Sequence, residues 1–404
     1  MSSKPEILWR ASPNPAPVVA RIAVAGDFLP AGNLTFSDGE SWATKAAQLG
    51  SIFSSVDSTF ANLESPVDVT GLAPQPLTGI GTIVSAPTES LDYLRAIHAH
   101  AVGIANNHAF DFGPVGLERT RNAIERAQMM PTGNCSSTLA PPSFSIRTGT
   151  NGIRVGFWAA ARASRELATR TRAGVEPATL ARGREALAEM KTRGAQFCVA
   201  LLHAGCLRTN RPEPADLALM DALAAAGFHI VAASHSHRIS GYKRITHSDG
   251  TPAHCFYGLG SIVSAYVATP EEREGIIVTA SLGADASLAT LEVHAVKLDN
   301  SGFAAVPAPG ERSAILARFH DLSREISDGS YQRMFYDEVG QNLGDLYLRD
   351  VRAAYRQGGV AGLVKKAGRI RLTHMKRLFH KIASSPSSQV PQAPDHAASG
   401  AGHD

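Results

Sequence analysis

Five apolar runs of strand length, each followed at once by polar residues, limit most strongly how this chain can fold. The polar residues lie in Gly26-Asp27, Asn62-Leu63-Glu64, Asn106-Asn107-His108, His203-Ala204-Gly205 and Ser234-His235-Ser236-His237. Segments with helical spacing follow several of these runs, as at residues 115–127 and 215–226. A repeated order of strand, polar cluster and helix is typical of α/β folds with largely parallel sheets. Strands that are apolar throughout also fit sheets covered on both faces.

The pattern of apolar residues predicts the individual elements of this fold. We expect strands at residues 18–25, 58–61, 101–105, 143–146, 153–157, 197–202, 228–233, 253–259, 275–281 and 287–297. We expect helices at residues 41–49, 87–98, 115–127, 179–192 and 215–226, and a long loop at 67–86. The residues after the last strand are helical in pattern, at 313–328, 331–357 and 363–382.

These elements suggest four parts of the chain. Residues 1–17, rich in Pro and Ser, are predicted to be a flexible arm, and residues 18–306 to be the main domain. Residues 307–383 are predicted to be a helical extension, and residues 384–404 a disordered tail. Between Asp350 and Ile382 the extension has nine Lys or Arg residues and one acid. Its basic helix could pack on the domain through an apolar stripe or contact an anionic membrane surface.

Composition excludes several classes of protein. A formal charge of +3 over 404 residues argues against a general nucleic-acid binder. The four cysteines form no Cys-x-x-Cys pair, and no apolar run reaches the ~18–20 residues of a membrane span. We therefore expect a cytoplasmic protein, with the basic helix as a possible peripheral membrane contact.

The polar clusters predict a metal site if the carboxyl ends of their strands converge. They would bring together two carboxylates, Asp27 and Glu64, with amide oxygens and several imidazoles. Mixed oxygen and nitrogen ligands suit Mn, Fe or Zn, and a carboxylate between two ions can bridge them. Each residue also has a simpler explanation, since Asp27 and Glu64 could cap turns and His203 could be an ordinary strand-end histidine. Five such clusters in succession favour the shared site.

Longer motifs in the same places resemble those of the CapA family of bacterial capsule or poly-γ-glutamate biosynthesis proteins. The resemblance spans residues 19–265 and rests chiefly on Ala61-Asn62-Leu63-Glu64 and on the run from Asn106 to Gly113, with shorter matches at Ala25-Gly26-Asp27, His203-Ala204-Gly205, Ser234-His235-Ser236-His237 and Tyr257-Gly258-Leu259-Gly260-Ser261. It implies the calcineurin-like metallophosphoesterase fold, an α/β sandwich of four layers with two central mixed sheets flanked by helices.

The resemblance also implies roles for individual residues. One of two divalent ions (Mn, Fe or Zn) would be held by Asp27, Glu64 and His237, and the other by Glu64, Asn107, His203 and His235. His108 resembles the histidine that contacts substrate and protonates the leaving group, and Asp111 would orient it. We expect Asn62 and Asn106 to contact substrate. The superfamily's first motif, Asp-x-His, has Leu29 at its last position here, so the Asp27 site lacks one imidazole.

Three functions follow from this resemblance as expectations. The first is metal-dependent hydrolysis of a phosphoester in capsule or exopolymer biosynthesis. The second is a non-catalytic factor for polymer assembly or export, in contact with the synthesis machinery. The third is hydrolysis of the amide bonds of a γ-glutamyl polymer. The expected substrate is accordingly a phosphoester or an anionic polymer.

Overall fold

The structure, a computed structural model, describes residues 5–341 except 12–16, 76–81, 150, 163, 165 and 248. The chain divides into two compact units, Met1–Tyr331 and Gln332–Asp404. All of the predicted site residues belong to the first unit, so the fold of this unit positions the site. The predicted helix at 363–382 and the predicted tail lie outside the described residues.

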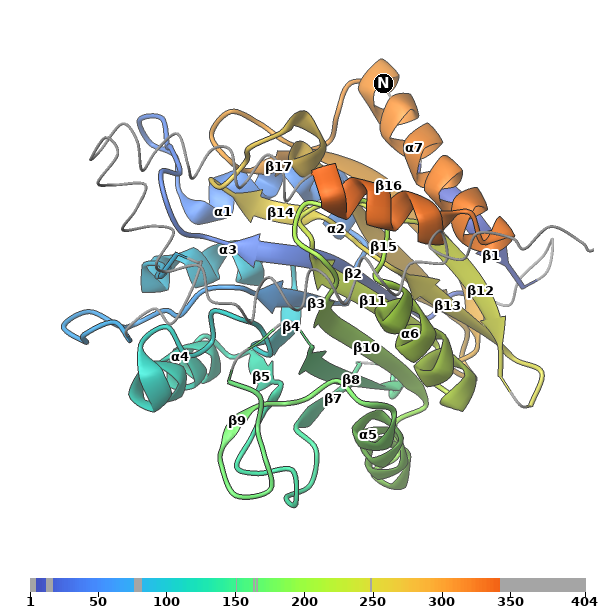
Figure 1. Ribbon diagram of the computed structural model, residues 1–404, viewed down its shortest axis with the longest axis horizontal. Helices are drawn as coiled ribbons and strands as arrows, with labels where there is room; N and C mark the ends of the chain where they lie inside the picture. Colours follow the sequence, from blue (N-terminus) through green and yellow to red (C-terminus); the bar gives the residue numbers. More distant parts are fainter. Residues whose placement is uncertain are drawn as a thin grey trace, which may run out of the picture. The chain divides into compact units, whose positions relative to one another are not determined.

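The first sheet has parallel strands in one half and antiparallel strands in the other (Figure 1). In spatial order its strands are β1 (Glu6–Arg10), β16 (Leu288–Leu298), β15 (Glu274–Leu282), β2 (Ala20–Leu29), β3 (Ser58–Leu63), β4 (Ala99–Gly103) and β5 (Met130–Thr132). Two short strands join it, β14 (Ser261–Ser264) beside β2 and β17 (Ala304–Ala305) beside β16. Strands β2 to β5 run parallel to one another, which places their carboxyl ends at one edge.

The second sheet also combines parallel and antiparallel strands. Its order is β12 (Tyr242–Thr246), β13 (Pro252–Phe256), β11 (Ile230–His235), β10 (Phe197–Ala204), β8 (Arg154–Ala161) and β7 (Phe144–Thr148). The four inner strands are parallel, and the two edge strands are antiparallel to their neighbours. A separate pair joins β6 (Asn134–Cys135) to β9 (Gly174–Val175).

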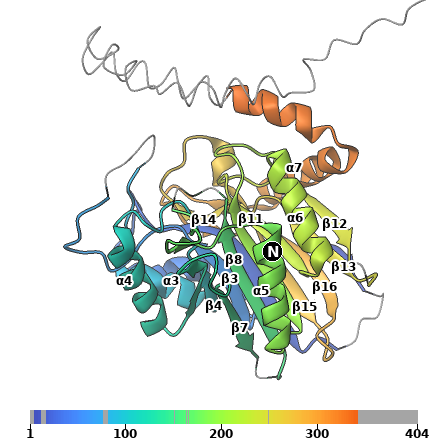
Figure 2. The ribbon, with the colours of Figure 1, turned by 60° about the horizontal axis from the view of Figure 1, so that its bottom comes forward.

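Helices cover the outer faces of the two sheets. They are α1 (Trp42–Ala46), α2 (Gly50–Phe53), α3 (Leu91–Ala96), α4 (Gly113–Arg126), α5 (Leu180–Thr192), α6 (Pro214–Ala226) and α7 (Pro309–Asp328), with short 3₁₀ turns η1 (Ala47–Leu49), η2 (Thr88–Ser90) and η3 (Pro270–Arg273). In Figure 2, α5 and α6 lie side by side over the second sheet, apart from α3 and α4, which pack on the first. The predicted α/β architecture of two mixed sheets flanked by helices is confirmed.

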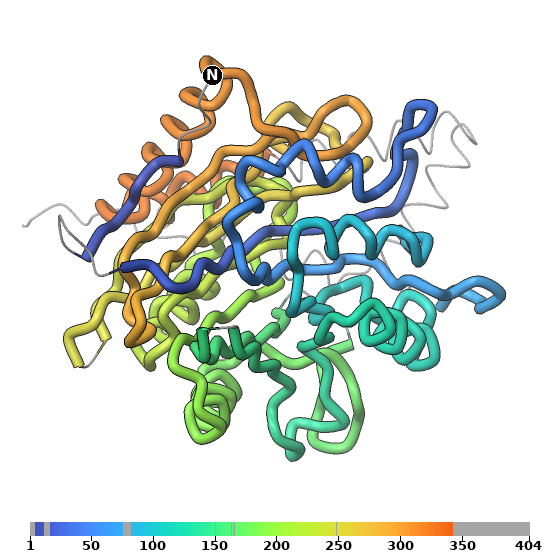
Figure 3. The backbone as a smooth tube through the Cα atoms, turned by 180° about the vertical axis from the view of Figure 1, so that it is seen from behind, coloured from blue at the N-terminus to red at the C-terminus, as the bar shows by residue number. Residues whose placement is uncertain are grey.

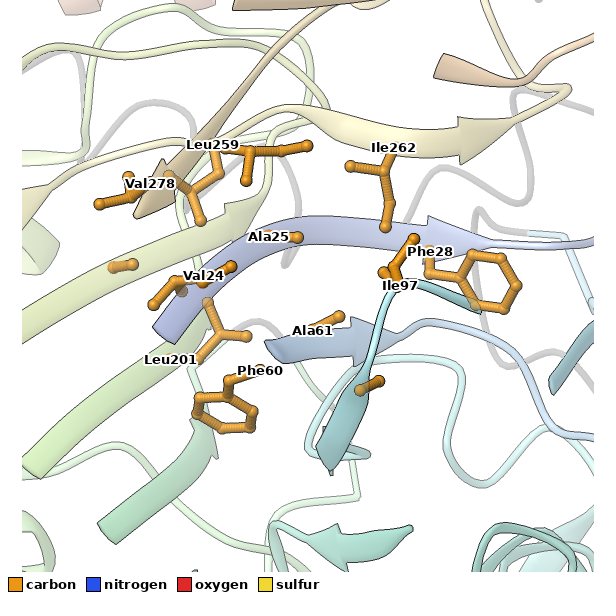
Figure 4. Close-up of a cluster of buried hydrophobic side chains, with 14 of the residues drawn as sticks. Val24, Ala25, Phe28, Phe60, Ala61, Ile97, Leu201, Leu259, Ile262 and Val278 are labelled. Atoms are coloured by element: carbon orange, nitrogen blue, oxygen red, sulfur yellow. The ribbon is translucent and has the colours of Figure 1, made fainter. Parts of the chain in front are cut away.

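The two sheets face each other across a common apolar core. Along β10, Phe197, Val199 and Leu201 enter this core, whereas the intervening residues enter the second core beneath α5 and α6. The rings of Phe60 in β3 and Phe157 in β8 meet edge to face, 5.0 Å apart, which joins the sheets directly. Figure 4 shows Phe60 and Leu201 in this core, together with Val24 of β2. Alternating side chains thus serve two cores, which is why the sequence of β10 is apolar throughout.

The expectation of a flexible arm over residues 1–17 is wrong for residues 6–10. These residues form β1, which pairs antiparallel with β16 and lies along it in Figure 3. Trp9 contributes a ring contact with His254 at 5.5 Å. An exposed edge of the long strand β16 would leave backbone N–H and C=O groups unpaired, and β1 covers that edge. Because β1 is short and preceded by Pro5, the sequence pattern did not predict it as a strand.

The predicted boundary at residue 307 also differs from the structure. Helix α7 belongs to the same compact unit as the sheets. Its residues Ile315, Phe319 and Leu322 are buried in the core that includes the first sheet. Their helical spacing gives one apolar face. Residues 309–328 are therefore part of the main domain, not of a separate extension.

Candidate metal centre

The predicted polar residues meet where the parallel strands of both sheets end. Asp27 lies in β2 opposite Asn62 in β3, and Glu64 follows β3 directly. In the second sheet, His203 of β10 pairs with Ser234 of β11, the residue before His235. Because carboxyl ends of parallel strands share an edge, and the two sheets face each other, five separate segments reach one place.

Two groups of side chains at this place have the spacing of metal ligands. One group contains Glu64, His203 and His235, and the other contains Asp27, Glu64 and His237. Within each group, one potential ligand atom from every residue lies within 4.8 Å of the others. Glu64 belongs to both groups. Asn107 extends the first group, because its Oδ1 lies 2.6 Å from His203 Nε2. The predicted convergence of all six residues is therefore observed.

Two buried atoms of this cluster lack hydrogen-bond partners among the described residues. They are Oε2 of Glu64 and Nδ1 of His235, and the Glu64 side chain is 1% exposed. A buried polar atom without a partner costs about 1–3 kcal/mol, and more when it is charged. Both atoms can bind a metal ion. Divalent ions would thus satisfy the atoms that the protein itself leaves unsatisfied.

The electrostatics of the cluster also favour added positive charge. Burial by itself raises the pKa of Asp27, but the hydrogen bond and charge of His237 hold this pKa well below its usual range. Burial, reinforced by the charge of Asp27, raises the pKa of Glu64 well above its usual range. Burial lowers the pKa of His235 to about 4. Two carboxyl groups this close resist joint ionisation, and a cation between them removes the repulsion.

The chain holds Asp27 in place before any ion binds. Its Oδ1 accepts a hydrogen bond from Asn62 Nδ2 at 2.7 Å, and its Oδ2 accepts one from the backbone N–H of His235 at 2.9 Å. The preceding residue must be glycine, because a Cβ at Gly26 would lie 2.0 Å from the carbonyl oxygen of Gly260. This close approach lets the Asp27 N–H bond that same oxygen at 3.0 Å.

His108 lies close enough to the cluster for its charge to act on His203 and His235. Its Nδ1 is 2.8 Å from Oδ2 of Asp111, and the side chains are 15% and 11% exposed. The same carboxylate oxygen accepts the backbone N–H of Val84 at 2.8 Å, so Asp111 is fixed independently of His108. Asp111 therefore contacts the His108 ring at its Nδ1.

Comparisons with known proteins identify the family. Residues 21–266, more than half of the chain, match the family described as bacterial capsule synthesis protein PGA_cap. The chain belongs to this family. The matched region contains every residue of the candidate metal centre.

The chain is also similar to a curated protein and to solved structures. The chain is 26% identical to the capsule biosynthesis protein CapA of Bacillus anthracis over 186 residues, which are 45% of this chain and 44% of that protein. A 5′-nucleotidase precursor from Thermus thermophilus aligns with a TM-score of 0.44 and 15% identity over 75% of this chain and 58% of its own. The calcineurin-like phosphoesterase YfkN from Bacillus subtilis aligns with a TM-score of 0.42 and 13% identity over 76% and 98%.

The two residues that the sequence analysis expects to contact substrate are buried. Asn62 and Asn106 are 3% and 1% exposed. Asn106 Nδ2 donates to Asn62 Oδ1 at 3.2 Å and to the Leu63 carbonyl at 2.8 Å, and its Oδ1 accepts the His108 N–H at 3.1 Å. Their amides therefore connect Asp27 to the His108 loop. Such burial favours support of the centre over direct contact with substrate.

Sequence reasoning gave no role to the side chain of Ser261. Ser261 Oγ lies 3.1 Å from His237 Nδ1 and thereby helps to orient that ring. Its motif, Gly-Leu-Gly-Ser, was the available signal. Leu29, two residues after Asp27, is 3% exposed in a small apolar cluster with Ala31 and Val84. Among the described residues, no helix combines the length and apolar character needed to cross a membrane.

Proposed function

We propose that this chain is a metal-dependent hydrolase that cleaves a phosphoester in capsule or exopolymer biosynthesis. The observation that carries the proposal is the shared position of Glu64 in two adjacent ligand groups. Two ions bridged by one carboxylate, ~3.5–4 Å apart, are the arrangement that stabilises displacement at phosphorus. The capsule context is supported by the family match and by the name of the Bacillus anthracis relative, of which the chain spans less than half.

Each side chain has a defined part in this proposal. Asp27, Glu64 and His237 would hold one ion, and Glu64, Asn107, His203 and His235 the other. Mn, Fe or Zn ions bound here would stabilise negative charge at phosphorus and lower the pKa of a water molecule. Asn62 and the His235 N–H keep both oxygens of Asp27 directed into the centre. The position of Asp27 as a ligand would thus be set by hydrogen bonds from neighbouring residues.

His108 is the group that we expect to exchange a proton with the leaving oxygen. Its Nδ1 faces Asp111, which leaves Nε2 as the nitrogen for the substrate. The position of His108 is set from two directions, by Asp111 at the ring and by Asn106 at the backbone N–H. An imidazole held in this way suits general acid catalysis.

A phosphoesterase screen with the purified full chain tests the proposal. We expect hydrolysis of one or more phosphoesters after loading with Mn, Fe or Zn, and loss of both metal and activity in Glu64→Ala. Glu311→Ala is the control, since Glu311 is an exposed carboxylate paired with Lys297 at 2.6 Å. Cleavage of polyglutamate without phosphoester turnover would support the amide hydrolase instead. Metal binding without hydrolysis of either substrate would support the assembly factor.

A further inference from the structure

The histidine turn, residues 235–239 at the end of β11, has an uncommon backbone conformation. His235 and His237 have φ values of +113° and +57°. Residues other than glycine avoid this region, and such a conformation persists only where surrounding contacts hold it. Each histidine belongs to one of the two ligand groups. The contacts that hold the histidine turn therefore affect both proposed ion sites.

The turn that follows β10 supplies two of these contacts. The backbone N–H of Arg208 donates to the Ser236 carbonyl at 3.0 Å, and Asn210 Nδ2 donates to the Ile239 carbonyl at 2.8 Å. One acceptor lies between the two histidines in the sequence, and the other lies two residues after them. These contacts can hold the histidine turn only if the turn after β10 is itself fixed.

Helix α7 fixes the turn after β10 through an ion pair. The guanidinium of Arg211 meets the carboxylate of Glu325 in two contacts, Nε to Oε2 and Nη2 to Oε1, each 2.8 Å long. The side chains are 23% and 20% exposed. Paired contacts between an arginine and a carboxylate fix direction as well as distance. The position of the turn after β10 therefore depends on α7.

The same helix holds the chain where it leaves the histidine turn. The backbone N–H of Tyr242 donates to Ser323 Oγ at 2.9 Å, and this hydroxyl donates to the Phe319 carbonyl within α7 at 2.7 Å. Gly241 allows the close approach, because a Cβ there would lie 2.6 Å from the backbone nitrogen of Ser323. The histidine turn is thus connected to α7 both directly and through the turn after β10.

We propose that α7 positions the histidine turn of the metal centre, with Ser323 and Glu325 as the positioning residues. This inference rests on the proposed function, because it takes His235 and His237 to be metal ligands. Helix α7 lies outside residues 21–266, the region that matches the family. A helix beyond the matched region therefore supports two ligands that lie within it.

Titration of the metal-free full chain with Mn ions tests this inference without requiring turnover. We expect Ser323→Ala and Glu325→Ala each to weaken the binding of both ions by about tenfold, the lower end of the range for residues that orient metal ligands. Both ions should be affected, because each takes one histidine from the turn. Hydrogen exchange of the metal-free protein is the second measurement. The amides of residues 235–239 should exchange faster in both variants, because the contacts that hold the turn are weakened.

Arg318→Ala is the matched control. Arg318 also joins α7 to a sheet by a partly exposed ion pair, to Glu274 of β15 at 3.2 Å. Its Mn affinities and the exchange of residues 235–239 should equal those of the wild type.

Two results would overturn the inference. Unchanged Mn affinities or unchanged exchange in Ser323→Ala and Glu325→Ala would show that these residues do not position the turn. Equal changes in Arg318→Ala would show that α7 only stabilises the domain. A wild type that binds no Mn would overturn the inference together with the metal centre. The expected changes in a protein that hydrolyses no phosphoester would support the inference and reject the proposed function alone.

Discussion

Replacement of Asn106 by alanine tests whether the buried amides organise the centre. The change removes two donated hydrogen bonds, to Asn62 Oδ1 and the Leu63 carbonyl, and one accepted from the His108 N–H. Each buried group left without a partner costs about 1–3 kcal/mol. Water that enters the vacated space should form hydrogen bonds with some of these groups. We therefore expect the free energy of unfolding to fall by about 2–5 kcal/mol.

The catalytic effect should be separable from this loss of stability. Without Asn106 the His108 backbone is less fixed, whereas Asn62 still donates to Asp27. We expect kcat to fall by about 10–100-fold with KM and metal content nearly unchanged, because a small misplacement of an acid reduces rate strongly. Chemical denaturation, steady-state kinetics and elemental analysis measure the three quantities.

The exposed Asn151 provides the control. It also donates to one backbone carbonyl, of Val19, and accepts one backbone N–H, of Ile153, but it lies at the turn between β7 and β8. Asn151→Ala should leave kcat unchanged and cost less than about 1 kcal/mol. Unchanged stability and kcat in Asn106→Ala would refute the idea that its amide couples the ligands to His108.

Three further predictions follow from the same structure. His108→Ala should keep its metal and lose about 10²–10⁴-fold in rate, and Asp111→Asn should lose less, because it only orients the ring; metal loss in the first variant would make His108 a ligand. Metal titration should resolve two unequal affinities, with the weaker at the Asp27 site, because Leu29 supplies no imidazole there; equal affinities would contradict this. Burial lowers the pKa of His229 to about 4 and that of His254 to about 3. The unfolded chain therefore binds more protons below pH ~6.5, and stability should fall between pH 7 and 5 by about 2 kcal/mol for each imidazole, with a smaller fall in His229→Asn.

The sequence was sufficient to locate the centre because strand ends are simple to place. Asp27, Glu64, His203 and His235 each follow or end an apolar run, and parallel strands must bring such residues to one edge. The same pattern could not assign Asn62 and Asn106. An amide side chain can bind an ion, contact a substrate or form a hydrogen bond with a neighbouring side chain. Its burial depends on contacts between distant segments.

Other features depend on interactions that no local pattern records. The strand β1 forms because β16, near the other end of the described chain, offers an open edge. The turn after β10 is likewise held by distant residues, since Arg208 bonds to the Ser236 carbonyl and pairs with Glu272. Helix α7 had a clear helical pattern, but only its buried face shows that it belongs to the main domain.

Anomalous diffraction from crystals soaked in Mn tests the central claim most directly, since it locates ions independently of activity. We predict two peaks on either side of the Glu64 carboxylate, ~3.5–4 Å apart. One should lie near Asp27 and His237, and the other near His203 and His235. Soaked crystals with no anomalous peak within bonding distance of Glu64 would contradict the metal centre and the function built on it.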